Sequence, residues 1–101
     1  MAKQAKKAKT PADVLGKMLM EARREAEVKQ EVLAEQLGFS KANTVIARIE
    51  SGDRDILLLE FIEFCESVDQ DPVALFSDFL AQIEGMPRTT VRKMKRAQRG
   101  K

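Results

Sequence analysis

Polar side chains that can hydrogen-bond to nucleotides gather in one short stretch of this chain, which begins at Ser40 and ends at Arg48. Asn43 carries an amide that offers a donor beside an acceptor, as the edge of adenine requires. The forked guanidinium of Arg48 fits the edge of guanine or a phosphate, and Thr44 can place its methyl group on thymine. Ser40 and Lys41 lie earlier in the stretch, where we expect contacts with phosphate rather than with bases.

The same residues could also form the solvated face of an ordinary helix, so the surrounding composition matters. No Asp or Glu occurs between Gly38 and Ile49, although the rest of the chain's central segment is acidic. A carboxylate in this stretch would repel a phosphate backbone. Its absence favours a surface that binds a polyanion.

Charge is strongly segregated along the chain, although the formal net charge is only +2. All sixteen acidic residues lie between Asp13 and Glu84, where seven basic residues leave a formal charge of −9. Residues 1–12 contain four lysines and residues 85–101 contain seven basic residues, with no acid in either segment. Such tails are typical of polyanion-binding chains, but tails that aid solubility or fold back onto an acidic body look the same.

The residue types exclude most catalytic chemistry. The chain has no His, Tyr or Trp, and its single cysteine, Cys65, lies in an apolar context without an imidazole to activate it. No Gly-rich phosphate loop and no cluster of metal ligands occurs, so we expect no enzyme, no metal and no cofactor. One cysteine excludes an intramolecular disulfide framework. Without a secretory signal or the roughly 18 apolar residues of a membrane span, a cytoplasmic, nucleoid-associated protein is expected.

The spacing of apolar residues predicts an all-α domain over 10–84 between basic tails over 1–9 and 85–101. Thr10 and Asp71 suit the N-cap position, and each is followed by a proline at the first helical position. Gly38 and Gly52 suit the position just after a helix. Five helices are expected, over about 11–26, 30–37, a third ending at 50 or 51, 56–68, and 72–84.

Aliphatic residues are expected to hold the third helix from behind. Ile46 and Ile49 would pack it against the second and fourth helices, and the small Ala34 would let a neighbouring helix approach closely. The start of the third helix would then project outward. A helix about 10–12 Å across fits a DNA major groove about 12 Å wide.

The run QEVLAEQLG followed by IARIESG resembles the Cro/repressor-type (XRE) helix-turn-helix family of bacterial and phage regulators. The resemblance extends over about residues 14–80 and includes Arg23, where this family usually has an arginine. It implies a compact five-helix bundle with a helix-turn-helix, the lambda-repressor-like fold. It also implies a small transcriptional regulator that binds double-stranded DNA by sequence. Nine residues match the family pattern: Gln30, Leu33, Ala34, Leu37, Gly38, Ile46, Ile49, Glu50 and Gly52.

The resemblance also implies individual roles. Gln30, at the start of the second helix, would contact a phosphate, and Arg54, in the turn after the third helix, would meet the DNA backbone. Arg23 and Glu50 would form a partly buried ion pair that ties the first helix to the third. Base edges would be faced by Asn43, Thr44 and Arg48, with Ala47 beside them.

Several positions depart from the family pattern. The segment from Gly38 to Glu50 is two residues longer than usual, so the turn or the start of the third helix must differ. Glu27 stands where glycine is common, so the turn before the second helix is expected to be longer or strained. Lys29 replaces a capping Ser or Thr, and Ala47 replaces the usual Ser.

The last two helices carry more large apolar side chains than a lone domain needs. Similar regulators of this family, such as restriction–modification controllers, pair through their C-terminal helices, so we expect a homodimer on an inverted-repeat site. The alternative is that these side chains complete the core of a monomer. The candidates for an exposed dimer strip are Phe64, Phe79, Leu80 and Ile83.

Two other functions would use the same features. An antitoxin or adaptor would bind DNA with the helical body and hold a protein partner with a terminal segment, for which the basic C-terminal tail is available. A nucleoid or RNA-associated protein would bind through the tails without sequence choice. All five phenylalanines lie in apolar contexts, so the chain lacks the aromatic platform expected for single-stranded RNA.

Overall fold

The computed structural model describes residues 10–39 and 44–87 of the chain. The predictions for Ser40, Lys41 and Asn43, and nearly all of those for the two tails, lie outside these ranges. Within them the fold is all-α, as predicted, and no strand occurs. The helices are α1 (Pro11–Glu25), α2 (Gln30–Gln36), α3 (Thr44–Ser51), α4 (Leu58–Ser67) and α5 (Pro72–Gln82).

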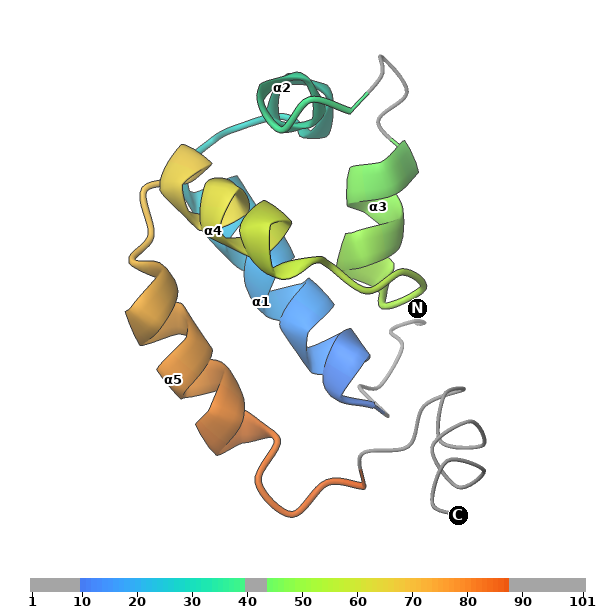
Figure 1. The fold of residues 1–101 in the computed structure, drawn as a ribbon, viewed down its shortest axis with the longest axis vertical. Coiled ribbons are helices and arrows are strands. Elements are labelled where there is room, and N and C mark those ends of the chain that lie inside the picture. Colours follow the sequence, from blue (N-terminus) through green and yellow to red (C-terminus); the bar gives the residue numbers. More distant parts are fainter. Residues whose placement is uncertain (1–9, 40–43, 88–101) are drawn as a thin grey trace.

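The helices are arranged around α1 and α4 (Figure 1). In this view α3 lies on one side of these two helices, α5 lies on the other, and α2 closes the top. Helix α1 packs against α3, α4 and α5. The helix-turn-helix pair of α2 and α3 is therefore held on a scaffold that it shares with the C-terminal helix.

The starts of α1 and α5 follow the capping signals in the sequence. The Thr10 hydroxyl accepts a hydrogen bond from the Asp13 amide, and the Asp13 carboxylate accepts one from the Thr10 amide, each at 3.2 Å. At α5 the Asp71 carboxylate accepts a bond from the Val73 amide at 3.1 Å. These bonds satisfy amides that have no partner within the helix, and both helices therefore begin where predicted.

The end of α2 is a sharp change of direction that depends on Gly38. Its φ of +85° lies in the left-handed region, which costs glycine little. The Gly38 amide donates to the Glu35 carbonyl at 3.1 Å, and the Phe39 amide donates to the Ala34 carbonyl at 2.9 Å. This pair of bonds is a Schellman motif, which satisfies the last carbonyls of the helix and fixes the direction in which the chain leaves it.

The turn between α1 and α2 is strained at the position where the family pattern has glycine. Glu27 adopts a φ of +61°, in a region that costs a residue with a side chain about 1–2 kcal/mol. Lys29 occupies the N-cap of α2 and makes no capping bond with its side chain. The strain that was expected at this turn is confirmed, and the start of α2 lacks the usual cap as well.

The core is built from residues of α1 to α5, and it corrects part of the dimer prediction. Phe64 is fully buried and Ile83 is 3% exposed, so neither lies on an exposed strip of the single chain. Ile83 shares the inner face of α5 with Leu75 and Phe79 at four-residue spacing, and α5 folds back onto α1 and α4. Phe79 is partly buried, whereas Leu80 remains 46% exposed.

The packing of α3 also differs from the expectation. Ile46 and Ile49 are buried as predicted and share one hydrophobic core with side chains of α4, but the backbone of α3 makes its close approaches to α1 and α2. The reason is Gly16 in α1. A Cβ atom at Gly16 would lie 2.5 Å from the carbonyl oxygens of both Ile49 and Glu50, so the two backbones touch where α1 has no side chain. Helix α1 therefore lies against the backbone of α3, and α4 meets α3 through the shared core.

Candidate nucleic-acid interface

Helix α3 divides into a buried face and an exposed face. Ile46, Ile49 and Glu50 point inward and are at most 7% exposed. The exposed residues recur at the three- and four-residue spacing of a single helix face, and they are Thr44, Ala47, Arg48 and Ser51. Three of these four were predicted to face base edges. The fourth predicted base contact, Asn43, directly precedes the described part of the helix.

The ion pair between Arg23 and Glu50 is present and holds the inner face of α3. Arg23 Nε donates to Glu50 Oε2 at 2.6 Å, and Arg23 Nη2 donates to Glu50 Oε1 at 3.0 Å. The two side chains are only 10% and 3% exposed. A two-pronged bond of this kind fixes orientation as well as distance, so α3 cannot rotate about its axis without breaking it.

Two further bonds extend this pair to the turn before α2 and to α2 itself. Arg23 Nη1 donates to the Val28 carbonyl at 2.9 Å. Gln30 Nε2 donates to Glu50 Oε1 at 2.9 Å. Gln30, which was predicted to contact phosphate, thus has one amide hydrogen on Glu50. This hydrogen-bond network joins α1, α2 and α3. It also neutralises the charge of Glu50, which is the only carboxylate of α3 and lies on its buried side.

Arg54, which was predicted to meet the DNA backbone, lies against two side chains of the protein. Its Nη1 donates to Glu60 Oε1 at 3.0 Å and to the Asp55 carbonyl at 3.0 Å, and its Nη2 donates to Glu60 Oε2 at 3.3 Å. Its guanidinium carbon lies 5.7 Å from the centre of the Phe39 ring. The bond to Glu60 raises the pKa of Arg54, and the same bond lowers the pKa of Glu60.

Sequence reasoning missed three residues that support this surface. Gly16 lies inside a predicted helix, where a single glycine gives no sign of what approaches it. Phe39 and Glu60 were not assigned roles, because their link through Arg54 joins segments that no local spacing relates. The family pattern marks the arginine but does not identify its partners.

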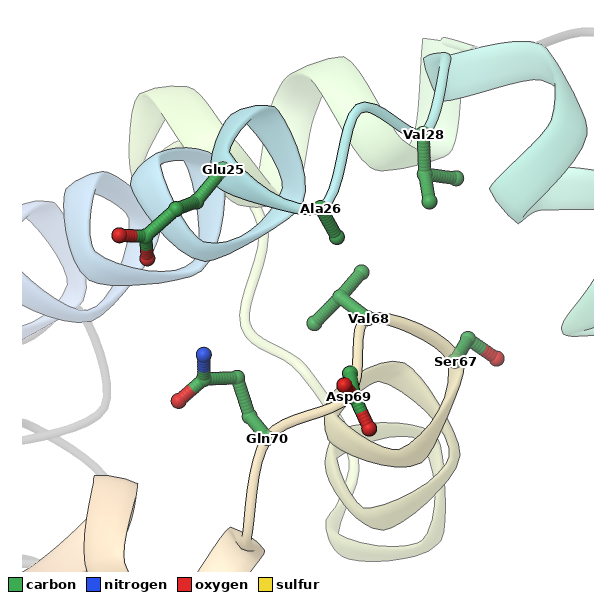
Figure 2. Close-up of a pocket in the computed structure, with 7 residues that line it drawn as sticks. All are labelled: Glu25, Ala26, Val28, Ser67, Val68, Asp69 and Gln70. Atoms are coloured by element: carbon green, nitrogen blue, oxygen red, sulfur yellow. The ribbon is translucent and has the colours of Figure 1, made fainter.

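A pocket of about 360 Å³ lies away from α3, between the end of α1 and the connection from α4 to α5. Figure 2 shows Ala26, Val28 and Val68 on its walls, with Glu25 and Asp69 beside them. Its lining contains carboxylates and no basic side chain. The pocket is therefore unsuited to a phosphate, and it lies outside the candidate interface.

The described residues offer little for catalysis. Burial raises the pKa of the Cys65 thiol to about 11, so at neutral pH the sulfur is protonated and a poor nucleophile. Over residues 10–39 and 44–87, no three His, Cys, Asp or Glu side chains are grouped to hold a metal ion. In the same ranges no helix is both long enough and apolar enough to cross a membrane.

Comparison with known proteins gives two informative structural matches. No protein-family model matches the chain, and no curated protein does. The chain is similar to the crystal structure of the restriction-modification controller protein C.AhdI from Aeromonas hydrophila, with 26% identity and a TM-score of 0.58 over 64% of this chain and 96% of that one. It is also similar to an XRE-family like protein from Pseudomonas syringae, with 32% identity and a TM-score of 0.63 over 71% of this chain and 85% of that one. Together with the helix-turn-helix of α2 and α3, these matches show that the chain belongs to the XRE family of helix-turn-helix proteins.

Proposed function

We propose that this protein is a transcriptional regulator that binds double-stranded DNA by sequence, with the outer face of α3 in the major groove. The observation that carries the proposal is the division of α3 into two faces. Its inner face is fixed by Arg23 and by the close approach of Gly16. Its outer face exposes Thr44, Ala47 and Arg48 and bears no carboxylate. A rigidly held helix with such a face suits the reading of base edges.

The proposed contacts divide into those that select a sequence and those that position the protein. Arg48 would donate two hydrogen bonds to the edge of guanine, and Asn43 would hydrogen-bond to adenine. Thr44 and Ala47 would lie against thymine methyl groups. Each good two-pronged contact provides about 1–3 kcal/mol of discrimination. Phosphates would be met by Ser40 and Lys41 before α3, and by the second amide hydrogen of Gln30.

The basic tails would supply attraction that the acidic body cannot. Residues 13–84 carry a formal charge of −9, which repels DNA at long range. Eleven basic residues in the segments 1–12 and 85–101 offset it. Each phosphate they neutralise would add about 0.9 to the slope of log affinity against log salt. Affinity would thus depend on the tails, and selectivity on α3.

The test of this division compares Asn43→Ala and Arg48→Ala with the wild-type chain. The probes are a duplex selected by the wild type from a random library and a duplex of random sequence. We expect each substitution to reduce the ratio of the two affinities about tenfold, because each removes a contact that only the selected duplex offers. Fluorescence anisotropy with labelled duplexes measures both affinities.

Two controls separate base reading from loss of charge. Arg24→Ala removes an exposed arginine at the end of α1 and should leave the ratio unchanged. Removal of residues 1–9 and 86–101 should flatten the salt dependence and preserve the ratio. Equal weakening on both duplexes in Asn43→Ala and Arg48→Ala would contradict the proposed base contacts. Collapse of the ratio on tail removal would mean that the tails read bases themselves.

We further propose that the protein acts as a homodimer through an apolar surface on α4 and α5. The rings of Phe76 and Phe61 pack in a T-shaped arrangement with their centroids 6.4 Å apart, and this contact joins the two helices at this surface. A monomer that leaves so much apolar side chain exposed gains from covering it with a second copy. Two reading helices would then lie about 34 Å apart, one turn of an inverted repeat. The exposed residues are Leu57, Leu58 and Leu59 of α4 and its N-cap, and Val73, Phe76 and Leu80 of α5.

The dimer is tested by Leu80→Arg, which places a charge on the proposed surface. Sedimentation velocity should show a dimer for the wild type and an increase of at least tenfold in its dissociation constant for the variant. Gln82→Arg is the matched control, because it adds the same charge to an exposed position of the same helix that faces away from Val73 and Leu80. A wild-type chain that stays monomeric at about 50 µM, or equal effects of the two variants, would contradict this interface.

A further inference from the structure

Arg54 joins the chain segment that enters α3 to the segment that leaves it. It lies in the turn that follows α3, and its guanidinium is placed over the ring of Phe39, the last described residue before α3. A guanidinium within about 6 Å of an aromatic centroid is attracted to the face of the ring. The two ends of the α3 region are therefore in contact through this one side chain.

Glu60 anchors Arg54 to α4. Both of its oxygens accept bonds from the two terminal nitrogens of Arg54, at 3.0 and 3.3 Å. Glu60 Oε1 also accepts a bond from the Leu57 amide at 2.9 Å, so the carboxylate is fixed at the start of its own helix. Its side chain is 17% exposed, compared with 32% for Arg54, and this partial burial strengthens the pair relative to a surface ion pair.

Phe39 is fixed from the other side by α2. Its amide closes the Schellman motif on Ala34, and its side chain packs against the hydrophobic core. Phe39 therefore links Arg54 to α2, and Glu60 links Arg54 to α4. The segment between Gly38 and Glu50 is longer than the family pattern, so its ends need such a constraint more than a short turn would.

We propose that Phe39, Arg54 and Glu60 form a clamp that sets how α3 is presented, and that Arg54 acts on DNA binding as a positioning residue rather than as a phosphate contact. The proposal rests on the proposed function, since presentation of α3 matters only if α3 reads DNA. It gives Glu60 a role that its charge alone would not suggest. An acidic residue near the DNA-facing side would then favour selective binding.

Two substitutions separate the clamp from a phosphate contact. Arg54→Lys keeps the charge but loses the planar fork that fits both Glu60 and the Phe39 ring. Glu60→Ala removes a negative charge and leaves Arg54 free to reach a phosphate. If Arg54 contacts a phosphate, Arg54→Lys should change DNA affinity little. Glu60→Ala should then bind every duplex more tightly than the wild type does. The clamp predicts that both variants lose selectivity.

The experiment uses the full chain, the duplex that the wild type selects, and a random duplex, between about 50 and 200 mM salt. We expect both variants to lose three- to tenfold in the ratio of affinities, with the salt slope of Arg54→Lys unchanged. Glu63→Ala removes an exposed carboxylate from the same helix and is the matched control. Unchanged selectivity in Arg54→Lys together with tighter binding of both duplexes by Glu60→Ala would overturn the clamp.

Amide hydrogen exchange tests the clamp without DNA. The Phe39 amide should exchange several-fold faster in Glu60→Ala than in Glu63→Ala, relative to the Val68 amide at the far end of α4, because Glu60 holds Phe39 through Arg54. The Leu57 amide loses its own bond to Glu60 in this variant and is the positive control. Unchanged exchange at the Phe39 amide would overturn the clamp whatever the DNA result. Faster exchange in a chain that selects no duplex would instead support the clamp and refute the proposed function.

Discussion

Replacing Gly16 with alanine is expected to destabilise the protein by about 3 kcal/mol, at the upper end of the usual cost of overpacking. The new Cβ would lie 2.5 Å from two carbonyl oxygens of α3, and backbone atoms cannot rotate away as a side chain can. The sign of this change in stability is informative, because alanine in a helix interior is ordinarily about 1 kcal/mol more favourable than glycine. A separation of α1 from α3 is the only way to accommodate the methyl group.

Chemical denaturation followed by circular dichroism measures this effect, since the chain has no Trp or Tyr for fluorescence. Lys17→Ala, at the exposed neighbouring position of α1, is the control and should change stability by less than about 0.5 kcal/mol. All variants are compared at one protein concentration, because dimerisation would make stability concentration-dependent. A stabilised Gly16→Ala variant would show that α1 and α3 are not in backbone contact.

Replacing Glu50 with leucine is expected to cost about 3–5 kcal/mol, because it strands the Arg23 guanidinium in a nearly closed site. A domain of this size has a total stability of roughly 5–10 kcal/mol, so a large part of the population would unfold on mild heating. Arg23→Leu should have a similar effect, since it leaves the Glu50 carboxylate buried with only Gln30 as a described side-chain partner. Denaturation midpoints of the two variants measure both costs.

The double variant Arg23→Met, Glu50→Leu distinguishes a stranded charge from a packing defect. It leaves neither charge buried, so it should recover most of the stability lost by either single variant. An additive loss in the double variant would show that the cost arises from packing. A loss below about 1 kcal/mol in either single variant would show that water screens the pair.

Local signals in the sequence predicted the helices well. Thr10, Asp71 and the prolines that follow them mark helix starts because capping is a property of a few adjacent residues. Gly38 marks the end of α2 for the same reason. The strained turn at Glu27 was visible because a side chain stands where the family pattern has glycine. The inferences at Thr10, Asp71 and Gly38 depend on residues at most four positions apart, whereas the inference at Glu27 also required the family pattern.

The errors concern which helices meet. Apolar spacing on α3 shows which face is buried, but it does not show that α1 is the helix whose backbone approaches that face. Phe64 and Ile83 were placed on an exposed strip because an apolar residue on a helix looks the same whether its own chain or a second copy covers it. The Arg23–Glu50 pair was predicted only through the family resemblance, since 26 residues separate the two positions. Predicting which residues are neighbours in the folded chain requires either a structure or a related protein.

The two faces of α3 share no residue, and this separation bears on how such a protein diversifies. Ile46, Ile49 and Glu50 fix the helix, whereas the side chains at positions 44, 47 and 48 are exposed on its other face. Under the proposed function, gene duplication followed by drift at those three positions would change the preferred operator without loss of the fold. The same independence makes them suitable for a randomised library from which regulators with new targets are selected.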